Sequence, residues 1–182
     1  MILLVVKLRS SYIIAIIVVI IVVIAGAAFV ATLSGNGTVT LLVKDPPSYS
    51  SDVSSINVTF SKIELNQVVA GGNESWVTLT GTSTIVDLLK IINATETLGS
   101  FNVPVGNYSQ IRFMVSSVTA RINGQIVILS IPSGNETGLK VHFEEPFQLK
   151  SGETVTITID IRANDFGIHN GLFIPSISAS IS

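Results

Sequence analysis

The chain has 182 residues, a hydrophobic fraction of 47% and a formal net charge of −2. This length has room for one domain of ordinary size and an appendage. The residues after Ser34 carry eight basic and twelve acidic side chains. An acidic surface of this kind argues against a nucleic-acid partner, which selects a basic surface. The chain has no cysteine, so the domain depends on its core and its strand hydrogen bonds rather than on disulfides.

Residues 12–33 form an uncharged apolar stretch, YIIAIIVVIIVVIAGAAFVATL. As a helix with a rise of about 1.5 Å per residue it is about 33 Å long, enough to cross a hydrocarbon core of about 30 Å. Lys7 and Arg9 precede the stretch, so the positive-inside tendency predicts a cytoplasmic amino terminus. We therefore predict a short cytoplasmic segment at 1–11, a single transmembrane helix (a signal anchor) at 12–33 and an extracytoplasmic domain at 34–182.

Two other interpretations of the amino-terminal segment stay open. Ala25-Gly26-Ala27 offers the small residues that a signal peptidase selects, which would make the segment a cleaved secretory signal. The run KLRSSYIIAIIVVIIVVIAGAAF also resembles archaeal type IV pilins, in which a short basic leader is cut just before a long apolar helix. The cut would then fall near Ser10 or Ser11.

Beyond residue 34 the hydrophobic pattern alternates with period two between turn residues, which indicates β-strands. In chain order, the predicted strands are 38–43, 56–65 with a bulge near 61–62, 76–79, 108–122, 125–131, 139–143, 153–161 and 172–181. Residues 85–92 are ambiguous between a buried strand and a short helix. Asn123-Gly124 predicts a type I′ hairpin turn. About eight such strands predict a mainly β domain, one antiparallel β-sandwich, preceded by the single transmembrane α-helix.

Six asparagines stand two residues before Ser or Thr with no intervening Pro, whereas composition alone would give about two such triplets. Such sequons are typical of an exported, N-glycosylated chain. The competing explanation is that a Ser/Thr-rich β domain produces these triplets by composition. The six candidate glycosylation sites are Asn36, Asn57, Asn73, Asn93, Asn107 and Asn135.

The sequence predicts no metal site, no cofactor and no catalytic residue. His142 and Glu144 would share one face of a strand, but His169 is the only other histidine, and no HxH or HExxH spacing is present. Neither S-x-x-K nor G-x-S-x-G occurs. The adjacent Glu144 and Glu145 should face opposite ways on a strand, so they should not act as a pair. We therefore predict that the protein is not an enzyme.

Four further side chains each have a structural and a functional interpretation. Arg112 and Asp160 interrupt apolar strands, which places them on outward faces or makes them partners of one another. Trp76 and Tyr108 are either a sugar-stacking platform on the outer face or anchors of the core and of a turn.

Several segments together resemble the family catalogued as domain of unknown function 4382. Pro104-Val105-Gly106-Asn107-Tyr108 with Ile111-Arg112 resembles its P-x-G-x-Y…I-R stretch, and Pro132-Ser133-Gly134 with Thr137-Gly138-Leu139-Lys140 resembles its P-S-G-x-x-T-G-L-K element. Lys44-Asp45-Pro46, Val86-Asp87-Leu88-Leu89, Asp160 and Ile174-Pro175 stand where the family has related features. The resemblance implies an extracytoplasmic β-sandwich found in archaea and bacteria, with turn-forming roles for Gly106 and Gly134 and no assigned reaction.

The leading functional prediction is a membrane-anchored cell-surface β-sandwich protein, N-glycosylated, with a binding or envelope-structural role. Its predicted partners are the lipid bilayer through residues 12–33, cell-envelope components and other copies of itself. The alternative is a pilus or filament subunit that assembles through its amino-terminal helix or by strand exchange. For strand exchange, residues 172–181 or 38–43 would complete the sheet of a neighbour.

Overall fold

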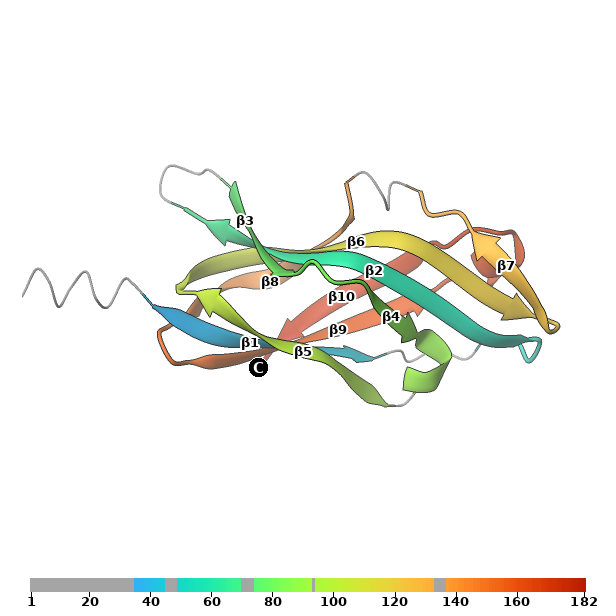
Figure 1. Cartoon of the computed structure of the whole chain (residues 1–182), viewed down its shortest axis with the longest axis horizontal. Coiled ribbons are helices and arrows are strands. Elements are labelled where there is room, and N and C mark those ends of the chain that lie inside the picture. Colours follow the sequence, from blue (N-terminus) through green and yellow to red (C-terminus); the bar gives the residue numbers. More distant parts are fainter. Residues whose placement is uncertain (1–34, 45–48, 70–73, 93, 133–136) are drawn as a thin grey trace, which may run out of the picture. The chain divides into compact units, whose positions relative to one another are not determined.

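The computed structural model describes residues 35–44, 49–69, 74–92, 94–132 and 137–182. Residues Asn36–Ser182 form one compact unit that consists mainly of β-strands in two sheets (Figure 1). The strands are β1 (Asn36–Lys44), β2 (Val53–Val68), β3 (Glu74–Thr80), β4 (Thr84–Asp87), β5 (Thr95–Pro104), β6 (Gly106–Ile122), β7 (Gln125–Leu129), β8 (Leu139–Leu149), β9 (Thr154–Ala163) and β10 (Pro175–Ile181). A short 3-10 helix, η1 (Leu88–Ile91), follows β4, and a short α-helix, α2 (Asp165–His169), follows β9.

One sheet has four strands in the order β10-β9-β1-β5, and the other has six strands. The six-stranded sheet runs β3-β2-β6-β7, with β4 also paired to β2 and β8 also paired to β6. The prediction of a purely antiparallel sandwich is wrong in one respect, because β1 pairs with β9 in parallel. Strand β9 enters this sheet from β8, which belongs to the other sheet, so no tight hairpin fixes its direction relative to β1.

Alternating apolar side chains from both sheets meet in a single core. In β1 the burial alternates strictly along Val39, Leu41 and Val43, as it should when one face of a strand is covered. The six-stranded sheet contributes its own inward face, on which the rings of Phe60 and Phe113 lie 5.4 Å apart. Burying each of these large side chains stabilises the fold by roughly 1.5–3 kcal/mol, so core packing is the main source of order in this cysteine-free domain.

The hairpin expected around Asn123-Gly124 is confirmed. Strands β6 and β7 pair from Ile122 and Gln125 outward. The φ angles of Asn123 and Gly124 are 49° and 77°, and positive φ at both central residues defines a type I′ turn. The expected bulge in the second strand is also present, as a shift of register around Phe60 in the pairing of β2 with β6.

Three expectations about individual strands need correction. The whole of β5 was missed, because most of its side chains point to solvent and it lacks the apolar alternation of a half-buried strand. Strand β8 continues through Pro146, where no residue of β6 lies in register with it, and proline is tolerated at such interruptions. The segment at 172–181 begins as a connection after α2 and becomes a strand only at Pro175.

The ambiguous segment at 85–92 contains both a strand end and a helical turn. Strand β4 ends at Asp87, whose side chain accepts hydrogen bonds from the backbone N–H groups of Leu89 and Ile56, both at 3.2 Å. The first bond caps η1 and the second ties it to β2. Leu88 is fully buried beneath this cap, so the Asp-Leu-Leu element of the family has a structural role here.

The expected transmembrane helix at 12–33 lies outside the described residues. Within the part of the chain that the structure describes, no helix is long and apolar enough to cross a membrane.

Candidate functional site

The outer face of the six-stranded sheet carries two adjacent rows of polar side chains. Ile63, Leu65, Ile111 and Phe113 point into the core, so the residues that alternate with them point away from it. The first row runs across β3, β2, β6 and β8 through Trp76, Asn66, Gln110 and His142. The second row runs across the same strands through Thr78, Glu64, Arg112 and Lys140.

Glu64 is the centre of this polar face. Its side chain is only 5% exposed, and both carboxylate oxygens have partners. Arg112 donates from Nε at 2.9 Å and from Nη2 at 2.5 Å to Oε2, and Lys62 donates from Nζ at 3.2 Å to Oε1. Burial on its own would raise the pKa of Glu64, but the hydrogen bonds from Arg112 and Lys62 outweigh it and lower the pKa. Glu64 is therefore an ionised carboxylate held by two cations.

Trp76 lies over this ion pair. The guanidinium carbon of Arg112 is 3.9 Å from the centroid of the Trp76 ring, and Nζ of Lys140 is 5.8 Å from it. Both distances are within the range of cation–π attraction. The indole therefore fixes Arg112 from one side while Glu64 fixes it from the other. The side chain of Arg112 therefore has fewer accessible conformations than that of an ordinary surface arginine.

Two buried amide groups lie beside the ion pair. Asn66 is 1% exposed and Gln110 is 4% exposed, and they face each other across β2 and β6. Ser109 donates a hydrogen bond to Oδ1 of Asn66 at 3.1 Å. Among the residues that the structure describes, however, Nδ2 of Asn66 and Oε1 of Gln110 have no hydrogen-bond partner. Native proteins seldom leave such atoms unsatisfied, and both atoms are shielded from solvent.

One residue from each of the two recognised family elements lies on this face. Arg112 and Lys140 lie opposite one another in the pairing of β6 with β8. Gly138 has a φ of 71°, and a Cβ there would lie 2.8 Å from Cγ of Arg112 and 2.8 Å from Sδ of Met114. A glycine at position 138 therefore lets the chain turn while it packs directly against the arginine.

Of the two interpretations of Trp76 and Tyr108, the structure supports the anchor for Tyr108 and excludes a platform shared by both rings. Tyr108 is fully buried, stacks on Phe147 with ring centroids 5.5 Å apart, and donates its hydroxyl hydrogen to the carbonyl of Pro104 at 2.6 Å. Burial raises the pKa of Tyr108 to about 12. Tyr108 therefore anchors the turn between β5 and β6, and Trp76 alone lies on the outer face. Nearby, a Cβ at Gly106 would meet the amide end of the Gln67 side chain, which would have to move.

Arg112 and Asp160 are also not partners of one another. Arg112 belongs to the six-stranded sheet, where its carboxylate partner is Glu64. Asp160 belongs to β9 in the other sheet, where it lies 3.2 Å from Arg162 and 3.8 Å from Lys44.

Three of the six sequon asparagines belong to the described residues. Asn36 is exposed at the start of β1, Asn107 is exposed at the start of β6, and Asn57 is half-buried within β2. Asn57 lies between Asp87 of β4 and Thr119 of β6. Asn73, Asn93 and Asn135 lie outside the described residues, and so does Gly134 of the recognised family element.

The two histidines lie in different places. His142 is exposed in the first polar row, on β8 opposite Gln110 of β6. His169, at the end of α2, lies 3.0 Å from Oδ2 of Asp52 and 2.9 Å from the carbonyl of Asp165. The bond to that carbonyl, and then the bond to Asp52, raise the pKa of His169. Across the described residues, no group of three or more metal-ligating side chains gathers.

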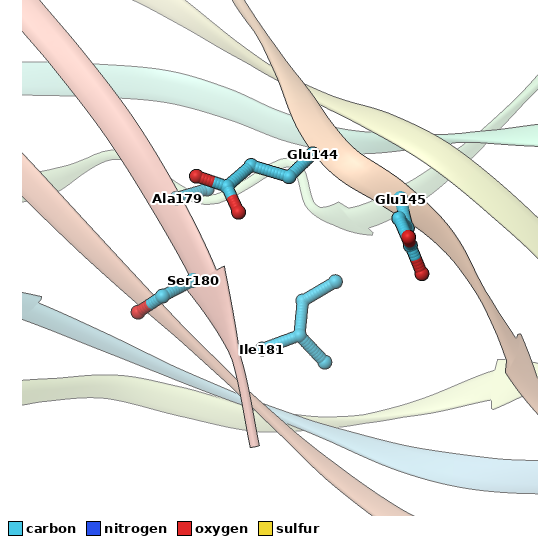
Figure 2. Close-up of a pocket in the computed structure, with 5 residues that line it drawn as sticks. All are labelled: Glu144, Glu145, Ala179, Ser180 and Ile181. Atoms are coloured by element: carbon cyan, nitrogen blue, oxygen red, sulfur yellow. The ribbon is translucent and has the colours of Figure 1, made fainter.

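Glu144 and Glu145 do not lie on opposite sides as strict alternation predicts. Both line an open hollow of about 310 Å³ together with Ala179, Ser180 and Ile181. Figure 2 shows the Glu144 side chain reaching from β8 toward Ala179 on β10, whereas the Glu145 side chain stays beside β8. The alternation fails because β8 leaves the register of β6 in this region. The hollow offers two carboxylates, with no cationic side chain among its lining residues.

Of the residues in the two polar rows, the sequence analysis names Trp76, Arg112, Lys140 and His142. The sequence analysis does not predict a functional role for Glu64, Asn66 or Gln110, or for the neighbouring Lys62. A usable signal was present in β2, where Lys62, Glu64 and Asn66 alternate with Ile63 and Leu65. Alternation shows that such residues face outward, but it does not show which strands bring their partners.

Comparison with known proteins gives a family and no characterised relative. No curated protein and no solved structure matches the chain. The family described as Domain of unknown function (DUF4382) matches residues 36–172, which include every residue of the two polar rows. The chain therefore belongs to the DUF4382 family.

Proposed function

We propose that the protein is a membrane-anchored cell-surface module, archaeal in type, that binds a ligand on the outer face of its six-stranded sheet. Residues 12–33 would form the anchor and the β domain would lie outside the cell, N-glycosylated at its sequons. The anchor is supported by 22 consecutive uncharged residues that follow two basic ones. Export is supported by the six sequons.

The observation that carries the binding role is the ordered polar cluster on the outer face. A sheet face that only meets water needs no buried carboxylate, because an ion pair of this kind adds little stability once desolvation is counted. Here Glu64 and Trp76 instead hold Arg112 in one position on the outer face. Such preorganisation lowers the ordering cost of binding a ligand.

The same cluster favours binding over catalysis. Both oxygens of the Glu64 carboxylate already accept hydrogen bonds from Arg112, Lys62 and Thr78. With its pKa lowered, this carboxylate is a weak base and is not free to take up a proton. We therefore propose a non-enzymatic role.

Co-sedimentation with isolated envelope polymers of the host tests the binding role. The full chain in detergent should sediment with them, and the double variant Lys62→Gln/Lys140→Gln should largely lose this ability. Lys44→Gln/Lys150→Gln removes the same charge away from the outer face and serves as the matched control. Equal losses in both variants, or no binding by the unmodified chain, would contradict the proposal.

Mass spectrometry of the native membrane fraction tests location and processing. A mature chain that begins at Met1 supports the anchor, and one that begins at Ser11 or Tyr12 in polymeric material supports the filament subunit instead. A start at Ala28 would mean secretion. In the structure β1 lies between β9 and β5, and β10 is an edge strand paired with β9. Exchange through either strand would require that strand to leave its own sheet.

The same spectra report the sequons. We expect glycans at the exposed Asn36 and Asn107 more often than at the half-buried Asn57, whose strand has neighbours on both sides. If none of the six asparagines carried a glycan in the native host, export would lose its independent support.

A further inference from the structure

Four large apolar side chains are exposed around β7 and the connection between α2 and β10. Ile126 and Ile128 of β7 are 64% and 78% exposed, and Leu172 and Ile174 of the connection are 37% and 50% exposed. Most large apolar side chains of the described domain lie in its core instead. We refer to these four residues as the apolar patch.

The strand pairing places the four side chains of the patch on one side. Ser130, which follows β7, pairs in parallel with Leu172. Paired residues of a sheet point to the same face, and so do residues two apart along a strand. Ile126 and Ile128 therefore share the face of Ser130. By the same rule Ile174 shares the face of Leu172. The residues that alternate with them pack against the core: Val127, Leu129 and Phe173.

The backbone edge of β7 is open beside the patch. The N–H of Ser130 donates to the carbonyl of Gly171, and the carbonyl of Ser130 accepts from the N–H of Phe173, each at 2.8 Å. These bonds lie on the side of the strand away from β6, and backbone groups two residues apart along a strand point the same way. Those of Ile126 and Ile128 therefore point to the free edge. Strand β7 is short, but it has no charged residue, proline or register shift to protect this edge.

The area of the patch suits a stable protein contact. At roughly 200 Å² for a fully exposed large apolar residue, the four exposed fractions amount to about 450 Å². A standard interface buries about 800 Å² on each partner, of which about 57% is apolar, or about 450 Å². An apolar patch of this size on a monomer is often functional.

The position of the patch keeps it clear of the start of the domain. Asn36 of β1 pairs with Pro104, next to the beginning of β6. Strand β7 pairs with the last residues of β6, from Val118 to Ile122, which lie about 40 Å or more farther along that strand. Figure 1 shows β7 at the end of the domain away from the start of β1. A contact at the patch therefore leaves the start of β1 unobstructed.

We propose that the patch is a contact between two copies of this chain, packed patch to patch about a two-fold axis. An uncharged apolar surface is complementary to itself, so this contact buries no unpaired charge. A lipid surface is a poorer occupant. Helix α2, bonded through Gly167 to Leu172, carries Asp165 and contacts Asp52, and anionic lipid would repel both carboxylates. The inference goes beyond the proposed function and uses no residue of the two polar rows.

Thiol cross-linking tests the contact, because the chain has no cysteine of its own. Ser130→Cys places a thiol inside the patch, whereas Ser178→Cys places an exposed thiol on β10 in the other sheet. A short bis-maleimide should cross-link the Ser130→Cys full chain in detergent into a dimer and leave the Ser178→Cys chain monomeric. Equal cross-linking of the two variants, or no cross-linking of Ser130→Cys, would overturn the proposal.

Sedimentation equilibrium of the full chain in detergent measures the strength of the contact. Ile126→Thr/Ile128→Thr should raise the dissociation constant of the dimer at least about tenfold, because both substitutions occur twice in the dimer. Val68→Thr/Ile85→Thr removes exposed apolar side chains elsewhere on the same sheet and should leave the constant unchanged. Threonine keeps the β-branched shape that suits a strand.

Two results of the sedimentation experiment would contradict the proposal. Equal effects of the two double variants would place the dimer contact outside the patch. A monomer at every concentration would show that the patch is not covered by a second copy, which leaves it to a lipid surface or to a different protein. Neither result bears on the co-sedimentation with envelope polymers, so the binding role is tested separately.

Discussion

The ion pair between Glu64 and Arg112 gives the sharpest prediction about the stability of the outer face. Removing one partner of a buried ion pair typically costs about 3–5 kcal/mol, because the other charge stays buried without compensation. Arg112→Gln should cost less, about 2–3 kcal/mol, since Lys62 still reaches Oε1 of Glu64 at 3.2 Å. Glu64→Gln should cost about 1–2 kcal/mol, because the side chain of Arg112 is 20% exposed and can hydrate.

A double-mutant cycle measures the coupling of the pair directly. The double variant Glu64→Gln/Arg112→Gln should cost at least about 1 kcal/mol less than the sum of the two single variants. Urea unfolding of the full chain, followed by far-ultraviolet circular dichroism, supplies the free energies. The signal from Trp76 is unsuitable here, because both substitutions change its surroundings.

The pH dependence of the pair follows from the sign of the pKa shift. The pKa of Glu64 is lowered below its ordinary value of 4.5. The stability that the pair contributes is therefore fully present above about pH 4.5 and is lost as the pH falls through the lowered pKa. The Glu64→Gln variant should lose less stability over this acid range than the unmodified chain. The reasoning would be refuted if the costs of the two single variants added up to the cost of the double variant, and if the Glu64→Gln variant and the unmodified chain lost the same stability at acid pH.

Three further predictions concern residues that support the fold around this face. Tyr108→Phe should destabilise the domain by about 0.5–1.5 kcal/mol, because the hydrogen bond from the Tyr108 hydroxyl to the carbonyl of Pro104 is lost. Ultraviolet titration should place the ionisation of Tyr108 near pH 12. The pKa of His169 is raised above 6.5. The contribution of His169 to the melting temperature should therefore be present at acid pH and disappear as the pH rises through that pKa. The His169→Asn variant should show a weaker dependence of the melting temperature on pH. Gly138→Ala should destabilise more than Gly152→Ala in urea unfolding. Both glycines have a φ above 70°, but a Cβ meets other atoms within 4 Å only at Gly138.

The sequence was sufficient for the local features of the fold. Period-two alternation identified most strands, and Asn123-Gly124 identified the one hairpin whose turn chemistry is unambiguous. The resemblance to the DUF4382 family was also visible in short elements, and the match over residues 36–172 confirms it.

The sequence did not predict which distant strands pair with one another. Glu64 and Arg112 are 48 residues apart, and neither local propensity nor alternation specifies which strands become neighbours. The same limit explains the parallel pair of β1 and β9, which depends on the path of the chain between the sheets. Strand β5 was missed for a different reason, because it is held by pairing with β1 while most of its side chains face solvent.

The intrinsic fluorescence of Trp76 tests the central claim most directly. Trp76 is the single tryptophan of the chain, and it lies in the proposed binding face, so any change in its emission reports on that face. Titration of the full chain in detergent with soluble fragments of the host's envelope polymers should give a saturable change in emission, and Lys140→Gln should shift it to higher ligand concentration. A ligand that binds by calorimetry and leaves the emission of Trp76 unchanged would contradict the account.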